Sequence, residues 1–174
     1  VCEPYECIGD MFGADCLALG EETNWNPDES CDGIPAYECG APTYCDAGGG
    51  CDEYITGVEV GDISNLGTPC DGYADYTAIT TYLLYGVDYD ITVTNGNYWS
   101  TDITTVWIDW NQDKDFADAD EMVTSGDPGG AIFTDVISVA AGALAGPTRM
   151  RIRIQYGGTP DPCGTTTYGE VEDY

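Results

Sequence analysis

Oxygen-bearing side chains alternate along the chain between residues 109 and 121, directly after an apolar stretch. The series is Asp109, Asn111, Asp113 and Asp115, and Asp118, Asp120 and Glu121 follow it. Calcium binds six to eight oxygens at about 2.3–2.6 Å, and a loop with this spacing wraps successive carboxylates and carbonyls around one ion. We expect the first four residues to be calcium ligands and either Glu121 or Asp120 to complete the shell.

The same charges provide the physical reason to expect an ion. Four or five carboxylates this close together repel one another strongly unless a cation neutralises them. The alternative is a solvated acidic turn without a metal. Lys114 occupies the position where such loops usually have Gly for a left-handed turn. Lysine there costs about 1 kcal/mol of backbone strain and places a cation near the ion, so we expect a modest affinity.

The charged residues exclude several classes of function. The chain has 32 Asp and Glu, 4 Lys and Arg, no His and a formal charge of −28. Nucleic acids need cationic side chains to neutralise their phosphates, so they are not expected partners. Without His, the Ser-His-Asp and Cys-His catalytic pairs and His-based zinc sites are ruled out. Paired carboxylates are the catalytic option left, and ion binding or solvation explains the acid clusters better, so we expect no enzyme.

The composition nevertheless predicts a folded chain in an oxidising compartment. Apolar residues make up 43% of the 174 residues and aromatic residues 11%, far more than solvated acidic tails contain. No apolar run approaches the ~20 residues of a membrane span, and the first residue, Val1, suggests a processed chain. Nine Cys without His or a CxxC pair indicate a disulfide framework, so we expect a secreted protein, extracellular or on the cell surface.

Short alternating strands dominate the chain from residue 44 onward. Apolar residues recur every second position over 87–93, 106–110, 132–139 and 150–156, and weaker candidates lie at 54–60, 78–84 and 168–174. Gly, Asn and Pro separate these segments, and no helical period is present. The pattern predicts an all-β fold, an antiparallel β-sandwich that is jelly-roll-like in strand number.

The first part of the chain has a different texture. Residues 1–43 contain ten acids, no base and five cysteines, with turn signals and no persistent period. We expect a loop-rich segment held together by cystines. It is either a cap on the sandwich at 44–174 or an arm that reaches a neighbouring subunit.

Three of the four cations alternate along one predicted strand. Arg149, Arg151 and Arg153 share one face, opposite the apolar residues, so they are not expected to point into the core. Glu170 and Glu172 are likewise two residues apart on the last strand. One expectation is an exposed Arg ladder beside a carboxylate ladder, each pair contributing ~0.2–1 kcal/mol. The alternative is a set of solvated charges.

Several motifs in a fixed order resemble the GEVED domain family over residues 43–174. They are Tyr44-Cys45, Tyr54-Ile55, GYADYT at 72–77, VWIDWNQD at 106–113, TRMR at 148–151, Cys163-Gly164 and the final Gly169, Glu170, Val171, Glu172, Asp173 and Tyr174. The resemblance implies an extracellular β-sandwich module of secreted and surface proteins in Bacteroidota-type bacteria, with no established catalytic role. It also implies a disulfide between Cys45 and Cys163, which leaves seven other cysteines, an odd number.

The resemblance also has departures that bear on assembly. Family members tend to continue past the final Tyr, so the last strand is expected to be short and to leave backbone groups open for an extended segment of another subunit. An odd cysteine implies a free thiol or a bridge between chains. A head-to-tail contact of this kind extends into a filament unless it closes into a ring. Calcium would then offset repulsion between subunits, although the acid excess is equally typical of adaptation to high salt.

Two classes of function remain. The first is a calcium-stabilised structural or adhesive subunit of a surface fibre, which assembles with identical copies through the N-terminal arm. The alternative is an accessory domain that binds glycan or protein, and exposed aromatic residues such as Trp99, Tyr98 and Trp107 would favour it.

Overall fold

The computed structural model describes residues 42–174, and Thr43–Tyr174 form one compact unit. The described residues contain strands and no helix, which confirms the predicted all-β class. No helix in this part of the chain could cross a membrane. The predicted cap or arm at 1–43 lies almost wholly outside the described residues.

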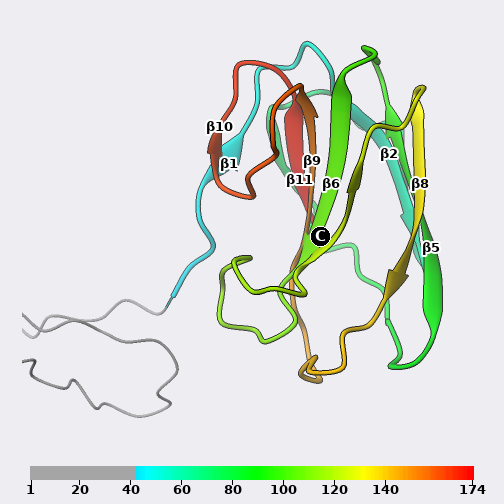
Figure 1. The fold of residues 1–174 in the computed structure, drawn as a ribbon, viewed down its shortest axis with the longest axis vertical. Coiled ribbons are helices and arrows are strands. Elements are labelled where there is room, and N and C mark those ends of the chain that lie inside the picture. Colours follow the sequence, from blue (N-terminus) through cyan, green and yellow to red (C-terminus); the bar gives the residue numbers. More distant parts are fainter. Residues whose placement is uncertain (1–41) are drawn as a thin grey trace, which may run out of the picture. The chain divides into compact units, whose positions relative to one another are not determined.

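Nine strands form two sheets (Figure 1). The four-stranded sheet has the order β3 (Ile63–Leu66), β2 (Ile55–Val60), β5 (Asp88–Asn95) and β8 (Ile132–Ser138). The five-stranded sheet has the order β4 (Tyr73–Asp75), β11 (Glu170–Asp173), β9 (Met150–Tyr156), β6 (Asp102–Ile108) and β7 (Met122–Gly126). Pairing within both sheets is antiparallel except between β4 and β11, which are parallel.

The core lies between the two sheets, as the two-residue period of the sequence predicts. Ile91 and Val93 of β5 are buried beside Val58 and Val60 of β2. Val106 of β6 and Ile152 and Ile154 of β9 close the same core from the other sheet. Alternate residues of β5 and β8, such as Asp88, Asp90 and Thr134, point away from it. The alternation of apolar and polar residues thus sets which face of each strand is buried.

A small third layer covers part of the outer face of the five-stranded sheet. It consists of β1 (Ala47–Gly48) and β10 (Gly164–Thr165), which pair in parallel (Figure 1). Side chains on the outer face are therefore buried too. Trp107 is only 2% exposed, so it does not provide the exposed aromatic surface that would favour a glycan site.

Two other expectations are corrected. Residues 78–84 form no strand. The last strand, β11, is short but not open, because it pairs with β9 on one side and β4 on the other. The outer strands of the two sheets are instead β3, β8, β4 and β7. A completing strand from another subunit could not add to β11.

The strands β6 and β9 run from the end of the sandwich that carries the acidic loop to the opposite end. β6 begins at Asp102 and ends at Ile108, next to the acidic loop. β9 runs antiparallel to it, so Tyr156 lies opposite Asp102 and Met150 lies opposite Ile108. The acidic loop is therefore at one end of these strands, and the turns around Trp99 and Tyr156 are at the other.

Candidate functional site

The acidic loop connects β6 to β7 and is anchored at both of its ends. Asp109, its first residue, is fully buried, and its backbone N–H donates to the carbonyl of Arg149 at 3.1 Å. Glu121, its last residue, is also buried, and its carbonyl accepts a 2.9 Å hydrogen bond from the backbone N–H of Ile108. The loop thus leaves and rejoins the sheet at neighbouring positions, so its acids face one another.

The carboxylates form two overlapping groups. Oxygen atoms of Asp109, Asp113 and Glu121 lie within 4.8 Å of one another, and so do those of Asp113, Asp115 and Asp118. Asp113 belongs to both groups. Five carboxylates from one loop therefore converge on a small volume, which is the arrangement that a hard cation requires.

Side-chain oxygens of the loop hold its successive turns by accepting hydrogen bonds from its own backbone. Backbone N–H groups donate to side-chain oxygens two or three residues earlier: Gln112 to Asp109 at 2.6 Å, Asp113 to Asn111 at 3.1 Å, and Asp115 to Asp113 at 3.1 Å. Such local bonds bend the backbone around the side-chain oxygens. Lys114 adopts the expected left-handed conformation, with φ of 76°, and Gln112 does as well, with φ of 63°.

Tyr44 fastens the loop to the segment that precedes β1. Its hydroxyl donates to Asp109 Oδ2 at 2.6 Å, and its ring stacks on Phe116 with centroids 5.2 Å apart. The Arg149 guanidinium lies 4.3 Å from the centroid of the same ring, and Lys114 Nζ lies 5.4 Å from it. Burial and the adjoining Asp109 carboxylate raise the pKa of the Tyr44 hydroxyl, so it remains a neutral donor.

Glu121 is the loop carboxyl whose pKa is raised by its surroundings. Burial, together with the carboxylates of Asp109, Asp118 and Asp113, raises the pKa of Glu121 to about 7. Backbone N–H groups of Trp110, at 3.1 Å, and Asp118, at 3.4 Å, are its hydrogen-bond donors. A divalent cation would favour the ionised form of this group and of its neighbours.

The donor set fits a metal ion that prefers oxygen. The loop carries carboxylates and side-chain amides, and it offers no thiol or imidazole. Asn111 contacts two carboxylates of the second group, since its Nδ2 donates to Asp113 Oδ2 at 2.9 Å and to Asp118 Oδ2 at 2.7 Å.

The predicted ligand residues divide into two sets. Asp109, Asp113, Asp115 and Glu121 fall in the two carboxylate groups, and Asn111 contacts them. Asp120 falls in neither group, and its carbonyl instead accepts a 3.2 Å hydrogen bond from Trp110 Nε1. The sequence analysis expected Glu121 or Asp120 to complete the shell, and Glu121 lies in a carboxylate group. It did not name Asp118 as a ligand, although Asp118 lies in a group and Asp120 does not. The loop spacing did not distinguish these two acids, because both follow Phe116 within four residues.

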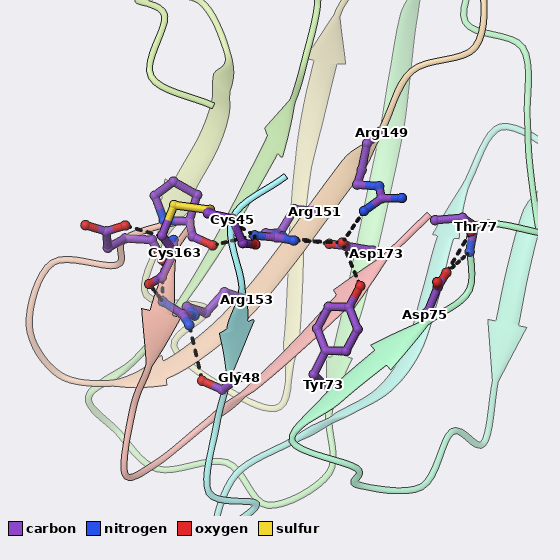
Figure 2. A network of polar contacts seen from close by, with 12 residues as sticks. Cys45, Gly48, Tyr73, Asp75, Thr77, Arg149, Arg151, Arg153, Cys163 and Asp173 are labelled. Atoms are coloured by element: carbon purple, nitrogen blue, oxygen red, sulfur yellow. Dashed lines mark hydrogen bonds and ion pairs between the residues drawn. A yellow bond between two sulfur atoms is a disulfide. The ribbon is translucent and has the colours of Figure 1, made fainter. Parts of the chain in front are cut away.

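A second charged site lies on the outer face of the five-stranded sheet, where Arg151 and Arg153 are each 1% exposed (Figure 2). Arg151 Nη1 donates to the carbonyls of Cys45 at 3.0 Å and Pro162 at 2.8 Å. Arg153 donates to the carbonyls of Gly48, Cys163, Gly164 and Asp161. The two guanidinium groups thus attach the small third layer to the sheet.

The predicted ladder between arginines and glutamates is wrong. In the register of β9 and β11, Arg151 faces Asp173 and Arg153 faces Val171, whereas Glu170 and Glu172 face Ile154 and Ile152. Because side chains alternate along a strand, the glutamates point to the core side and the arginines to the other side. The arginines are buried rather than solvated because β1 and β10 cover them.

The two glutamates of β11 are therefore buried carboxylates. Glu170 accepts hydrogen bonds from the backbone N–H groups of Ile55 and Asp71, both at 2.8 Å. Glu172 Oε2 accepts one from the Tyr174 hydroxyl at 2.6 Å, and its Oε1 has no partner among the described residues. Burial raises the pKa of Glu172 to about 7. Gly169 must be glycine, because its φ is 110° and a Cβ atom there would lie 2.0 Å from the Ile154 carbonyl oxygen.

Two disulfides occur in the described residues. Cys45–Cys163 has the pairing that the family resemblance implies. It links the segment before β1 to the segment before β10 in the third layer (Figure 2). Cys51–Cys70 is the second. The five remaining cysteines, Cys2, Cys7, Cys16, Cys31 and Cys39, lie outside the described residues.

A pocket lies at the end of the sandwich away from the acidic loop. It has a volume of about 250 Å³ and is lined by Asp52, Glu53, Trp99, Tyr156 and Tyr168. Trp99, which the sequence analysis named as an exposed aromatic residue, is 55% exposed. Tyr98, also named there, is half-buried and does not line the pocket. The sequence analysis did not identify the other four lining residues, because none of them is near Trp99 in the chain.

Comparison with known proteins supports the resemblance for part of the chain. The model of the GEVED domain family matches residues 103–174, from β6 to the end of the sequence. This segment contains the acidic loop, both buried arginines and the motif at 169–174. The match confirms the GEVED resemblance over these residues but does not extend to 43–102, where we also drew it. No curated protein and no solved structure matches the chain.

Proposed function

We propose that the protein is a non-catalytic extracellular structural module that binds calcium and assembles with copies of itself into a surface fibre. The observation that carries the proposal is the convergence of five loop carboxylates in two groups that share Asp113. Calcium suits this site better than magnesium, since a loop rich in carboxylates accommodates its larger and more variable shell. The two disulfides favour an oxidising compartment and hence secretion.

Calcium binding is tested by thermal unfolding with calcium and with a chelator. We expect calcium to raise the melting temperature, because an ion that binds only the folded state stabilises it. Asp113→Asn removes the charge common to both carboxylate groups, so it should abolish the shift. Asp90→Asn, on the exposed outer face of β5, is the matched control and should retain it. An identical melt in chelator and in calcium would refute the calcium site.

Assembly through the N-terminal arm needs an acceptor edge other than β11. The best candidate is β8, an outer strand of seven residues whose Ile132 and Val136 are 57% and 45% exposed. Exposed apolar outer strands accept an added strand readily. Electron microscopy of the purified chain, with and without chelator and reductant, tests this. Filaments that shorten on reduction would support an inter-chain disulfide, and Val136→Lys should suppress them if β8 is the acceptor. A monodisperse monomer in calcium would refute assembly.

One observation favours the alternative, an accessory domain that binds glycan or protein. The pocket at the far end of the sandwich is lined by three exposed aromatic residues, which suit a ligand with an apolar or ring-shaped face. A binding screen against glycans and peptides, with Trp99→Ala as the comparison, tests this candidate independently of the chelator experiment.

A further inference from the structure

Backbone hydrogen bonds hold two of the residues that line the aromatic pocket, Trp99 and Asp52. The Trp99 N–H donates to the buried Asp102 Oδ2 at 2.8 Å, and the Asp102 N–H returns a bond to the Trp99 carbonyl at 3.0 Å. Asp52 is next to the Cys51–Cys70 disulfide, and its carbonyl accepts a 2.5 Å hydrogen bond from Asn97 Nδ2. A ligand would therefore meet a preorganised site, which lowers the entropic cost of binding.

Two of the aromatic walls stand at an angle to each other. The rings of Tyr156 and Tyr168 have centroids 5.9 Å apart and an interplanar angle of 70°. Trp99 adds a third aromatic ring to the lining. Aromatic faces carry partial negative charge, so several of them around one volume attract a cation.

The remaining two residues are acids, and one of them has an unused oxygen. Glu53 is 1% exposed, and its Oε1 has no hydrogen-bond partner in the part of the chain that the structure describes. Burial and the nearby charge of Asp102 raise the pKa of Glu53. Asp52 is exposed at the rim, and no Lys or Arg of residues 42–174 lines the pocket. The lining can therefore accept hydrogen bonds and positive charge, and it holds no cation of its own.

We propose that this pocket binds an organic cation, an ammonium or guanidinium group carried by a larger molecule, with Trp99, Tyr156 and Tyr168 around it and Asp52 and Glu53 as its counter-charges. A neutral sugar would use the aromatic faces but would leave both carboxylates without a cation. A volume of about 250 Å³ admits a side-chain head or an amino sugar ring. The overall charge of −28 would also draw cations toward the surface. The proposal deepens the accessory binding function and rests on it, but not on calcium or filaments.

The test uses pairs of probes that differ only in charge, with the chain kept in calcium at physiological salt. A lysine-containing peptide is compared with its Nε-acetylated form, and a glucosamine trimer with the N-acetylglucosamine trimer, by isothermal titration. The two pairs also distinguish a peptide source from a glycan source. We expect a charged probe to bind saturably and its neutral counterpart to bind at least about tenfold more weakly.

Variants locate the binding. Trp99→Ala should weaken it between about threefold and thirtyfold, and Glu53→Gln by about tenfold. Tyr85→Ala, an exposed ring outside the pocket, should not change it. Glu53→Gln should also raise the melting temperature of the free chain, because it removes a buried charge, so weaker binding could not be ascribed to unfolding.

Binding of the neutral trimer alone would overturn the cation proposal and leave the accessory function standing. Binding of the charged probe that Trp99→Ala and Tyr85→Ala reduce equally would mark a diffuse surface effect and overturn the proposal as well. No binding of any probe, with no hit in the wider screen, would overturn both the proposal and the accessory function.

Discussion

Arg151 and Asp173 lie opposite each other on neighbouring strands and form a buried, bidentate ion pair. Arg151 Nε donates to Asp173 Oδ1 at 2.7 Å, and Nη2 donates to Oδ2 at 2.8 Å (Figure 2). Asp173 Oδ2 also accepts hydrogen bonds from Arg149 at 3.2 Å and from the Tyr73 hydroxyl at 3.0 Å. The pair joins the last strand to β9 beneath the third layer, and with Tyr73 of β4 three segments of the chain meet at one carboxylate.

Asp173→Asn should therefore destabilise the fold severely. The change leaves a buried guanidinium without its counter-charge, which costs about 3–5 kcal/mol. Denaturant unfolding measures the loss. Asp75→Asn is the matched control, because Asp75 pairs with Asp173 in the strand register but is exposed, and among the described residues its carboxylate bonds only to Thr77. We expect that control to lose less than about 1 kcal/mol, and equal losses would contradict the role given to the ion pair.

The raised pKa of Glu172 makes the stability of the fold depend on pH. Its pKa is raised from 4.5 in the unfolded chain to about 7 in the fold, so the folded state binds more protons between these values. The contribution of this group to stability is thus complete below pH 4.5 and is lost as the pH rises to 7, with a slope of about 1.4 kcal/mol per pH unit. Urea unfolding from pH 4 to 9 measures it.

Glu172→Gln isolates this contribution. The variant keeps an acceptor for the Tyr174 hydroxyl but cannot ionise, so its stability should fall less between pH 4.5 and 7 than that of the parent chain. It should be more stable than the parent at pH 8. Parallel pH profiles for the two proteins would show that Glu172 does not titrate in this range.

Within the acidic loop, Asp118 and Asp120 should differ in their effect on metal binding. Asp118 shares a carboxylate group with Asp113, whereas Asp120 belongs to neither group. Asp118→Asn should therefore weaken calcium binding, by about tenfold or more for a lost charged ligand, and Asp120→Asn should leave it nearly unchanged. Calorimetric titration with calcium measures both. A larger loss in Asp120→Asn would favour the ligand set expected from the spacing.

Lys114→Gly should tighten calcium binding for two reasons. It relieves a left-handed residue of about 1 kcal/mol of strain, and it removes a cation from the neighbourhood of the ion. Gln112→Gly relieves the other left-handed residue without changing charge, so it is the matched control. Lys114→Gly should increase the calcium affinity more than Gln112→Gly does. This difference in affinity should decrease at high salt, because salt screens exposed charges. Equal gains at every salt concentration would assign the effect to strain alone.

Loss of the Cys45–Cys163 disulfide should cost about 2–5 kcal/mol, because it closes a long loop in the unfolded chain. The bridge spans 118 residues, against 19 for Cys51–Cys70. Replacing both cysteines of the longer bridge by Ala should therefore destabilise the chain more than the same change in the shorter one. Thermal unfolding of the two double variants gives the comparison, and the reverse order would argue against the chain-entropy explanation.

The sequence by itself determined the features that depend on neighbouring residues. The two-residue period placed Ile91, Val93, Ile152 and Ile154 in a sandwich core, and the spacing from Asp109 to Glu121 predicted the acidic cluster, because side-chain direction and loop curvature are set within a few residues. The motif at 169–174 likewise marked the last strand.

Only the tertiary structure decided which distant residues meet. The register of β11 against β9 places Asp173, not Glu170 or Glu172, opposite Arg151, and a shift of one residue would exchange those faces. The third layer buries the arginines of β9 through contacts between segments more than 100 residues apart. The pocket likewise joins Glu53, Trp99 and Tyr168, whose proximity follows from strand order, which no local pattern encodes.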